Sequence, residues 1–375
     1  MSAAVPNVSR LRIPASAPTL AIDLAAIAAN TRRFAETTRG ELMAVVKADG
    51  FGHGLADVAR TALGNGATWL GVTSIEEGVA VRAAGVAAPV LSWLNPVDCD
   101  IETGYRHQLD LAVPSVSHLD AIIRSGCPVR VHLQLDTGMA RDGAAPEEWF
   151  ELVAAARRAE VAGRITVVGV MGHLAMADRP GHPANAAGRT ALLCGAEMVT
   201  RAGLRPKVRH LAGTAATLTD PSTHLDLVRI GVGLVGIDPS GSTRLRSALR
   251  LTAPVVQLRR VPAGTGIGYG HTEVTERPTT LALLPLGYAD GLPRTASGRA
   301  EALVAGRRRP VAGLISMDQT VLDLGDEPVD PGTDAVLFGP GDDGEPTVDD
   351  WAEWAGTIPH EIVTRIGSRV RRCVR

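Results

Sequence analysis

The residue best placed to do chemistry is Lys47, which ends a short apolar run and precedes a turn rich in glycine. Residues 43–46 are typical of a buried strand, and three glycines stand within the seven residues after the lysine. Holding an ammonium at such a strand end costs hydration and lowers the pKa of the amine, which prepares it to form a Schiff base with an aldehyde. Without further context, Lys47 could equally be a surface side chain that extends its amine into water.

Two arginines and a histidine are further candidates. Arg141 and His173 each come shortly after an apolar run, and Arg229 lies inside one. A guanidinium offers a planar pair of N–H groups that suits a carboxylate. Taken alone, Arg141 could be a surface ion-pair residue, His173 a hydrogen-bonded core side chain and Arg229 a structural residue.

Apolar runs of strand length alternate with alanine-rich stretches of helical length over the first part of the chain. About eight strands separated by helices over roughly 200 residues are typical of a (β/α)8 barrel, although a doubly wound sheet shares this pattern. Active sites of barrels lie at the C-terminal ends of the strands, where these candidates stand. A strand is predicted at residues 19–23, barrel strands at 43–46, 69–72, 90–93, 111–113, 129–135, 165–171, 208–211 and 228–230, and helices at 24–37, 55–63, 76–84 and 146–159.

The pattern changes near residue 247. Beyond it the apolar runs are short, β-branched and separated by Gly, Pro and Asp, which predicts an all-β domain. Its predicted strands are residues 254–258, 280–284, 301–304, 309–312, 320–324 and 335–338, followed by short helices at 348–355 and 359–366.

The segment around Lys47 closely resembles the cofactor-lysine motif of the alanine racemase family, in which an Ala-Val-Val-Lys-Ala strand runs into an aromatic-Gly-His-Gly turn. The resemblance covers essentially the whole chain after about residue 18. It implies a (β/α)8 barrel at residues 18–246 that binds pyridoxal 5′-phosphate (PLP) through Lys47, and a C-terminal all-β domain at residues 247–375. Residues 1–17 are rich in Ser and Pro, which predicts a disordered N-terminus. Other segments similar to family motifs are residues 136–141, 172–175, 210–215, 229–232, 269–270, 286–291 and 315–319.

The same resemblance implies a phosphate site. Thr214 keeps the hydroxyl of a family serine, whereas Gly213 lacks the amide of a family asparagine. The backbone N–H groups of Gly231 and Val232 are expected to hold the phosphate at a turn.

Two family tyrosines near the phosphate are replaced. Phe51 and His360 stand in their places, so fewer hydroxyl contacts are expected. The imidazole of His360, at the entrance, could bind a polar or acidic substrate side chain.

By resemblance, Arg141 lies beside the cofactor ring oxygen and the substrate carboxylate, and His173 packs near the cofactor. Many family members carry a carbamylated lysine two residues before Asp136, but this chain has Gln134, which cannot be carbamylated. Its amide oxygen or a bound small anion would therefore have to orient Arg141.

Arg229 bears on the type of reaction, since by resemblance it faces the pyridine nitrogen of PLP. A guanidinium cannot accept a proton, so it keeps that nitrogen unprotonated and makes the ring a weaker electron sink. This favours prompt return of a proton to the α-carbon, hence racemisation over transamination.

Racemisation needs an acid or base on each face of the α-carbon. Lys47 covers one face, and the resemblance assigns the other to Tyr269, reaching into the barrel of a partner subunit, which implies a homodimer with shared sites. The pKa of a phenol is normally about 10, so a relay from Tyr269 through His173 to Arg229 would have to lower it.

Two residues of the β-domain are expected at the substrate. Tyr288 would line the entrance, and the backbone N–H of Met317 would help to bind the substrate carboxylate. Alone, Met317 could be a gap-filling core side chain, and the glycines of residues 264–270 are better explained as turn residues than as a nucleotide loop.

Composition excludes several classes of protein. The formal net charge of -2, with 45% hydrophobic and 21% charged residues, fits a soluble globular protein without a nucleic-acid partner. No run of eighteen apolar residues or signal-peptide core occurs, so no membrane association is expected. The scattered cysteines support neither disulfides nor a metal site and favour the cytoplasm; they are Cys99, Cys127, Cys194 and Cys373.

These observations favour a PLP-dependent amino-acid racemase that acts on alanine or serine by default, or on a specialised biosynthetic amino acid. An aldolase, hydroxymethyltransferase or decarboxylase on the same fold is the first alternative. A non-catalytic PLP carrier is the second, although the retained Tyr269 and Met317 count against it. A metal-assisted dehydratase is less favoured because His360 and Cys373 lack close ligand spacing.

Overall fold

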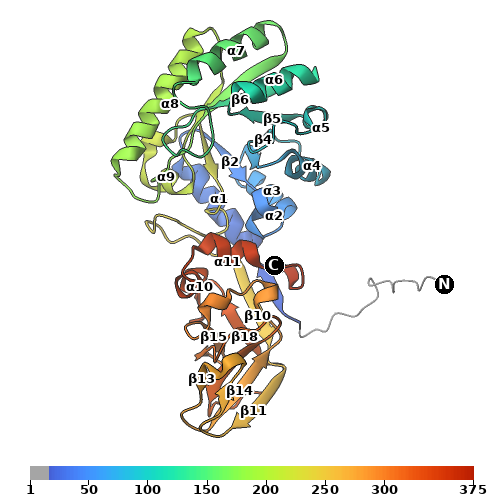
Figure 1. The fold of residues 1–375 in the computed structure, drawn as a ribbon, viewed down its shortest axis with the longest axis vertical. Coiled ribbons are helices and arrows are strands. Elements are labelled where there is room, and N and C mark those ends of the chain that lie inside the picture. Colours follow the sequence, from blue (N-terminus) through green and yellow to red (C-terminus); the bar gives the residue numbers. More distant parts are fainter. Residues whose placement is uncertain (1–16) are drawn as a thin grey trace, which may run out of the picture. The chain divides into compact units, whose positions relative to one another are not determined.

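The computed structural model describes residues 17–375, which form two units (Figure 1). Asp23–Ala248 make up one unit, and Leu249–Arg375 with the described residues up to Ile22 make up the other. The segment predicted to be disordered, residues 1–17, lies outside the described residues except for Ala17. No helix within residues 17–375 has the length and hydrophobicity needed to cross a bilayer.

Eight parallel strands form the sheet of the first unit and confirm the predicted (β/α)8 barrel. Neighbouring strands follow chain order from β2 to β8, and β9 returns to pair with β2, whereas a doubly wound sheet would reverse its order. The N–H of Arg229 in β9 donates to the carbonyl of Ala212 just after β8 at 2.9 Å, which draws the two ends of the sheet together. The strands are β2 (Glu41–Val45), β3 (Trp69–Val72), β4 (Val90–Ser92), β5 (Leu109–Val113), β6 (Val129–Gln134), β7 (Ile165–Met171), β8 (Val208–His210) and β9 (Leu227–Ile230).

Helices surround this sheet (Figure 1), and several of them begin at a capping side chain. Asp23, Ser74 and Ser115 each accept a hydrogen bond from the backbone N–H three residues further on, a cap worth about 1 kcal/mol. The caps fix where each helix starts and so fix the length of the turn before it. The helices are α1 (Leu24–Thr37), α2 (Lys47–Phe51), α3 (Leu55–Leu63), α4 (Ile75–Ala83), α5 (Ile101–Arg106), α6 (Val116–Ser125), α7 (Trp149–Val161), α8 (Pro183–Arg201) and α9 (Thr214–Thr219).

The second unit consists mainly of antiparallel sheets, as predicted. Its largest sheet has the order β16-β15-β18-β10-β1-β19, and a three-stranded sheet has the order β11-β14-β17. Its elements are β1 (Thr19–Ile22), β10 (Leu249–Pro254), β11 (Gln257–Val261), β12 (Gly266–Ile267), β13 (Glu273–Val274), β14 (Thr279–Leu284), β15 (Glu301–Val304), β16 (Arg307–Pro310), β17 (Thr320–Gly325), β18 (Asp334–Phe338), α10 (Val348–Ala355), α11 (Pro359–Arg365) and β19 (Arg371–Val374).

Several details of this unit differ from the sequence prediction; the strand predicted at residues 309–312, for example, is β16 at Arg307–Pro310. The barrel was expected to begin at residue 18, but β1 pairs antiparallel with β10 and parallel with β19. A short buried strand followed by a helix has the same pattern in either unit, so its partners cannot be read from periodicity. The predicted strand at residues 254–258 is two strands, because the chain passes from one sheet to the other between Pro254 and Gln257 within a continuous apolar run.

Candidate active site

Lys47 begins a left-handed turn at the end of β2. The next four residues, Ala48, Asp49, Gly50 and Phe51, have φ angles of 52°, 54°, 62° and 57°. Such a backbone costs a non-glycine residue roughly 1–2 kcal/mol. The predicted tight turn is therefore present, and it persists only because surrounding contacts hold it.

Two carboxylates hold the turn. Glu77 in α4 accepts a hydrogen bond from the N–H of Ala48 at 2.7 Å, and its other oxygen accepts from the N–H and hydroxyl of Thr73, both at 2.8 Å. Asp49 accepts from the N–H of Leu55 at 2.8 Å. The turn that carries the lysine is thus tied to both α3 and α4.

The environment of Lys47 favours its neutral amine. Partial burial lowers the pKa of Lys47, the cation Arg141 lowers it further, and Glu77 opposes both with a smaller effect. The neutral amine is the form that condenses with an aldehyde. The chain contains only one other lysine, the exposed Lys207.

The loop that carries Arg141 folds around Asp136. The Asp136 carboxylate accepts hydrogen bonds from the backbone N–H groups of residues 138–140 at 2.8 to 3.3 Å. The hydroxyl of Thr137 donates to the carbonyl of His173 at 2.6 Å and accepts from the N–H of His173 at 3.1 Å. These bonds join the loops after β6 and β7, so two of the predicted site residues lie on one braced surface.

Arg229 is the buried centre of the site. Its side chain donates to the carbonyls of Gly172 at 2.7 Å and Leu211 at 3.1 Å. It also contacts Nδ1 of His210 at 2.9 Å and Nδ1 of His173 at 3.0 Å. Burial lowers the pKa of Arg229 to about 10, so the guanidinium stays cationic near neutral pH.

His173 is held as a neutral imidazole. Desolvation, then the charges of Arg229, Arg141 and Lys47, lower its pKa to about 3. Part of its side chain is exposed to solvent. The charges of the three neighbouring cations lower the pKa of His173 even where solvent reaches the ring. Because Arg229 can only donate hydrogen bonds, Nδ1 of His173 accepts, and the ring proton sits on Nε2.

The predicted phosphate-binding residues are packed closely together. A Cβ placed on Gly231 would lie 2.7 Å from the ring of Phe51, so the ring covers this glycine closely. The hydroxyl of buried Thr214 accepts from the N–H of Gly233 at 3.3 Å. The carbonyl of Val232 accepts from the N–H of Val235 at 3.1 Å, which folds the turn after β9.

Gln134 does not orient Arg141 through its amide oxygen. That atom is buried and has no hydrogen-bond partner among residues 17–375. The first of the two arrangements predicted for this position is therefore not formed, and the bound anion stays a prediction.

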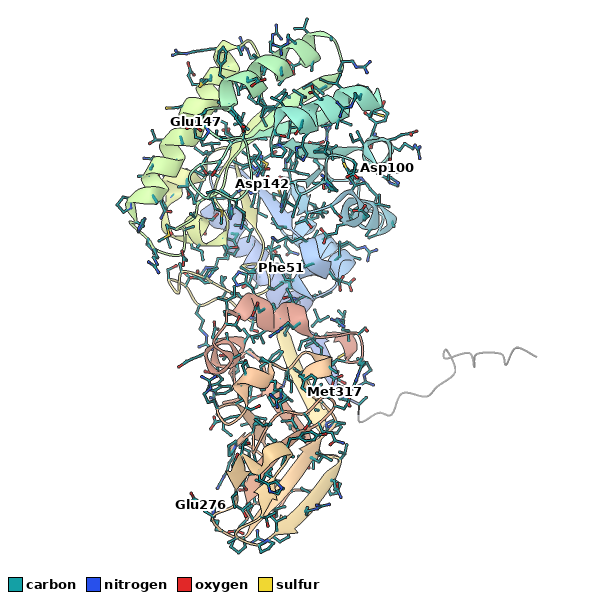
Figure 2. The ribbon with its side chains drawn as sticks, viewed as in Figure 1. Phe51, Asp100, Asp142, Glu147, Glu276 and Met317 are labelled. Carbon is teal, nitrogen blue, oxygen red and sulfur yellow. The ribbon has the colours of Figure 1, made fainter. Side chains whose placement is uncertain are left out.

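The remaining candidates belong to the second unit and are largely exposed. Tyr269 lies between β12 and β13 with 74% of its surface accessible, Tyr288 has 41% and Met317 has 54%. His360 is partly buried in α11. Figure 2 labels Phe51 and Met317, one from each unit.

An arginine braces the loops of Tyr288 and Met317. Arg369 contacts buried Asp290 at 2.9 Å and Asp318 at 2.7 Å. The N–H of Tyr288 donates to the carbonyl of Ser316 at 3.0 Å. The two predicted substrate-contacting residues therefore share one support, which the sequence analysis did not identify.

The sequence analysis also missed two buried polar residues behind Arg229. Asp110 and His132 lie on β5 and β6, with no accessible surface. A signal was present, because a histidine in an apolar strand is opposed in β7 by Gly169, and glycine inside a strand marks a close approach.

The barrel residues fit PLP. Lys47 would supply an amine of lowered pKa for the aldehyde, and Arg229 would supply donor-only N–H groups for the pyridine nitrogen. A threonine hydroxyl and a glycine-containing turn lie where a phosphate could bind. Groups of three or more His, Cys, Asp or Glu side chains suited to a metal ion do not occur in residues 17–375.

Comparison with known proteins gives a consistent result. The family models for the alanine racemase N-terminal and C-terminal domains match residues 22–239 and 248–374. The chain is 48% identical over 359 residues to an alanine racemase of Salinispora tropica, covering 94% of this chain and 96% of that protein.

Two solved structures are close to this one. The alanine racemase of Streptomyces lavendulae has a TM-score of 0.93 and 42% sequence identity, covering 97% of this chain and 98% of that chain. The alanine racemase of Bartonella henselae, solved with covalently bound pyridoxal phosphate, has a TM-score of 0.87 and 27% identity, covering 96% of this chain and 100% of that chain.

Proposed function

This chain belongs to the alanine racemase family and is a PLP-dependent amino-acid racemase, and we propose that it interconverts L-alanine and D-alanine with Lys47 and Tyr269 as its two bases. The name of the Salinispora tropica relative supports alanine as the substrate. Serine and more specialised amino acids are the competing substrates.

The observation that carries the reaction type is the fixed guanidinium of Arg229. Two backbone carbonyls and two imidazole nitrogens hold it, and its pKa of about 10 keeps it charged. Bound PLP acidifies the hydrogen on the α-carbon of an amino acid joined to it. Because Arg229 can donate but not accept a proton, it would leave the pyridine nitrogen unprotonated and limit electron withdrawal, which favours proton return to the α-carbon.

Each of the two bases would serve one face of the α-carbon. The amine of Lys47 takes or returns a proton on one side, helped by its lowered pKa. The phenol of Tyr269 does the same on the other side, with the Nε2–H of His173 as its hydrogen-bond donor. Arg141 would hold the substrate carboxylate through its planar N–H pair, with Tyr288 and Met317 at the entrance.

The same proposal includes a homodimer with shared sites. Tyr269 is 74% exposed on a short hairpin, an unusual place for a catalytic phenol unless another surface covers it. A two-fold dimer in which each β-domain supplies Tyr269 to the other barrel satisfies this requirement. We also place the enzyme in the cytoplasm, because its four cysteines are unpaired, and cell fractionation tests that placement.

The chain itself supplies a control for the cofactor test. Borohydride reduction of the purified enzyme followed by peptide mapping should place the pyridoxyl group on Lys47 and leave Lys207, the only other lysine, unmodified. Modification of Lys207 alone, or of neither lysine, would contradict the assignment.

Turnover in deuterium oxide then tests the reaction. With L-alanine, we expect D-alanine carrying deuterium at the α-carbon, resolved by chiral chromatography, and slower exchange with other amino acids. Products with a new or missing carbon and no α-exchange would instead indicate an aldolase, hydroxymethyltransferase or decarboxylase. Bound PLP without any turnover would indicate a carrier.

A further inference from the structure

A continuous row of polar groups crosses the barrel interior and ends at Arg229. Asp110 lies on β5, His132 on β6, His210 on β8 and Arg229 on β9, and the first three have no accessible surface. Nδ1 of His132 lies 2.8 Å from Nε2 of His210, and Nδ1 of His210 lies 2.9 Å from Nη1 of Arg229. Burying four such side chains is costly unless each satisfies the next.

The proton positions along this row follow from its arginine end. A guanidinium can only donate, so Nδ1 of His210 must accept and its ring proton must sit on Nε2. That proton is then donated to Nδ1 of His132, which places the proton of His132 on its own Nε2. Each group in the row therefore donates to the next one in the direction from Arg229 to Asp110. This order requires both imidazoles to be neutral and to carry their proton on Nε2.

The far end of the row meets a carboxylate. Nε2 of His132 lies 3.4 Å from one carboxylate oxygen of Asp110, within ion-pair range but long for a hydrogen bond. Neither atom has another hydrogen-bond partner among residues 17–375. The other oxygen of Asp110 is held by the guanidinium of Arg130 at 2.7 Å, so the carboxylate is fixed in position beside the imidazole.

The barrel wall is shaped to hold the His132 ring. A Cβ placed on Gly169 in β7 would lie 2.1 Å from Nδ1 of His132, so only glycine leaves room for the imidazole there. Trp69 packs edge-on against the same ring, with 5.6 Å between ring centroids. The strand register of β6 against β7 also shifts between Val131 and His132. These features are independent of the hydrogen bonds and fix the same side chain.

We propose that Asp110 and His132 are positioning residues that act through His210 to hold Arg229 in place for the reaction. This inference rests on the proposed function, because it concerns the residue that would face the PLP nitrogen. Asp110 anchors His132, His132 takes the proton of His210, and His210 presents a bare Nδ1 that one N–H of Arg229 must meet. The orientation of the guanidinium is thereby set from inside the barrel as well as from the carbonyls of Gly172 and Leu211.

Substitution of His132 tests the proposal. His132→Phe removes the acceptor for His210, whereas His132→Asn keeps an oxygen close to the position of Nδ1. His224→Phe is the matched control, because His224 is also buried in the same unit, but Nε2 of its ring contacts the backbone carbonyl of Thr217 and not this row. The holoenzyme forms are compared by kcat, by KM and by the absorption band of bound PLP.

We expect His132→Phe to lower kcat about tenfold, the effect of one buried hydrogen bond on a reacting group, to shift the PLP band and to leave KM within about twofold. His132→Asn should recover most of the rate and the band, and His224→Phe should match the wild type in both. A His132→Phe enzyme with the wild-type kcat and band would overturn the proposal. Equal losses in His132→Phe and His224→Phe would do so as well, since they would indicate a general packing effect.

A second measurement does not depend on any variant folding. Nitrogen NMR of the holoenzyme labelled with ¹⁵N-histidine should show His132 and His210 as neutral rings protonated on Nε2. A proton on Nδ1 of His210 would contradict the proposed order of donors and acceptors between Arg229 and Asp110. These shifts are separate from turnover. A wild type with no PLP band or racemisation would contradict the proposed function, whereas a wrong tautomer in an active enzyme would contradict only this inference.

Discussion

The two units present their candidate site residues in opposite ways. In the barrel, Arg229 has four side-chain hydrogen-bond contacts, and its exposed fraction is 7%. In the second unit, Tyr269 is 74% exposed at a hairpin. The barrel residues are therefore positioned by their own fold, whereas the phenol needs a surface that this unit does not supply to it. This contrast is what we expect when one half of a site is built in and the other half is completed by assembly.

The largest expected effect comes from removing the two proposed bases, Lys47 and Tyr269, in separate chains. Lys47→Ala and Tyr269→Phe should each reduce racemisation on the order of 10²–10⁴-fold, because each removes one of the two proposed acid/base groups. When the two inactive chains are unfolded together and refolded, mixed dimers should regain activity, to about a quarter of the wild-type value by random two-fold pairing. Chiral chromatography measures the recovery.

Failure of the mixed dimers to regain activity would contradict the contrast between the two units. A mixture that stays as inactive as its components would mean that both bases come from one chain, and Tyr269 would then need a covering surface within it. Mixing two preparations of Tyr269→Phe is the control, since no pairing of these chains restores a complete site.

The residues of the second unit that are proposed to meet the substrate also depend on a support that can be removed. Arg369→Met should raise KM for alanine about tenfold with a smaller change in kcat, because the charged hydrogen bonds of Arg369 to Asp290 and Asp318 hold the loops of Tyr288 and Met317. Arg106→Met is the matched control, since Arg106 pairs with Glu102 on an exposed barrel helix. Equal KM values for the two variants and the wild type would show that the brace does not shape the substrate site.

The candidate residues at the strand ends of the barrel could be predicted from the sequence better than the buried residues behind Arg229. Lys47 and His173 come at or just after the ends of apolar runs and Arg229 lies close to the end of one, and strand ends meet at one rim of a barrel, so their proximity follows from the chain order. The left-handed turn after Lys47 and the register shift beside His132 could not be predicted, because both depend on contacts between distant strands and helices. The same limit explains β1, whose apolar pattern suits either unit but whose hydrogen bonds belong to the sheet of β10 and β19.

The smallest predicted effect concerns the charge of Lys47 in the barrel. Burial and Arg141 lower the pKa of Lys47, against a smaller opposing effect of Glu77. A base with a lowered pKa loses its proton at a lower pH, so in cofactor-free protein Lys47 should titrate below the ordinary lysine pKa of about 10.4. Reductive ¹³C-methylation followed by NMR gives the titration curve of this side chain. A midpoint at the ordinary lysine value would show that the barrel places Lys47 without lowering its pKa, and the reactivity of its amine would then have to come from the bound substrate or from the partner subunit.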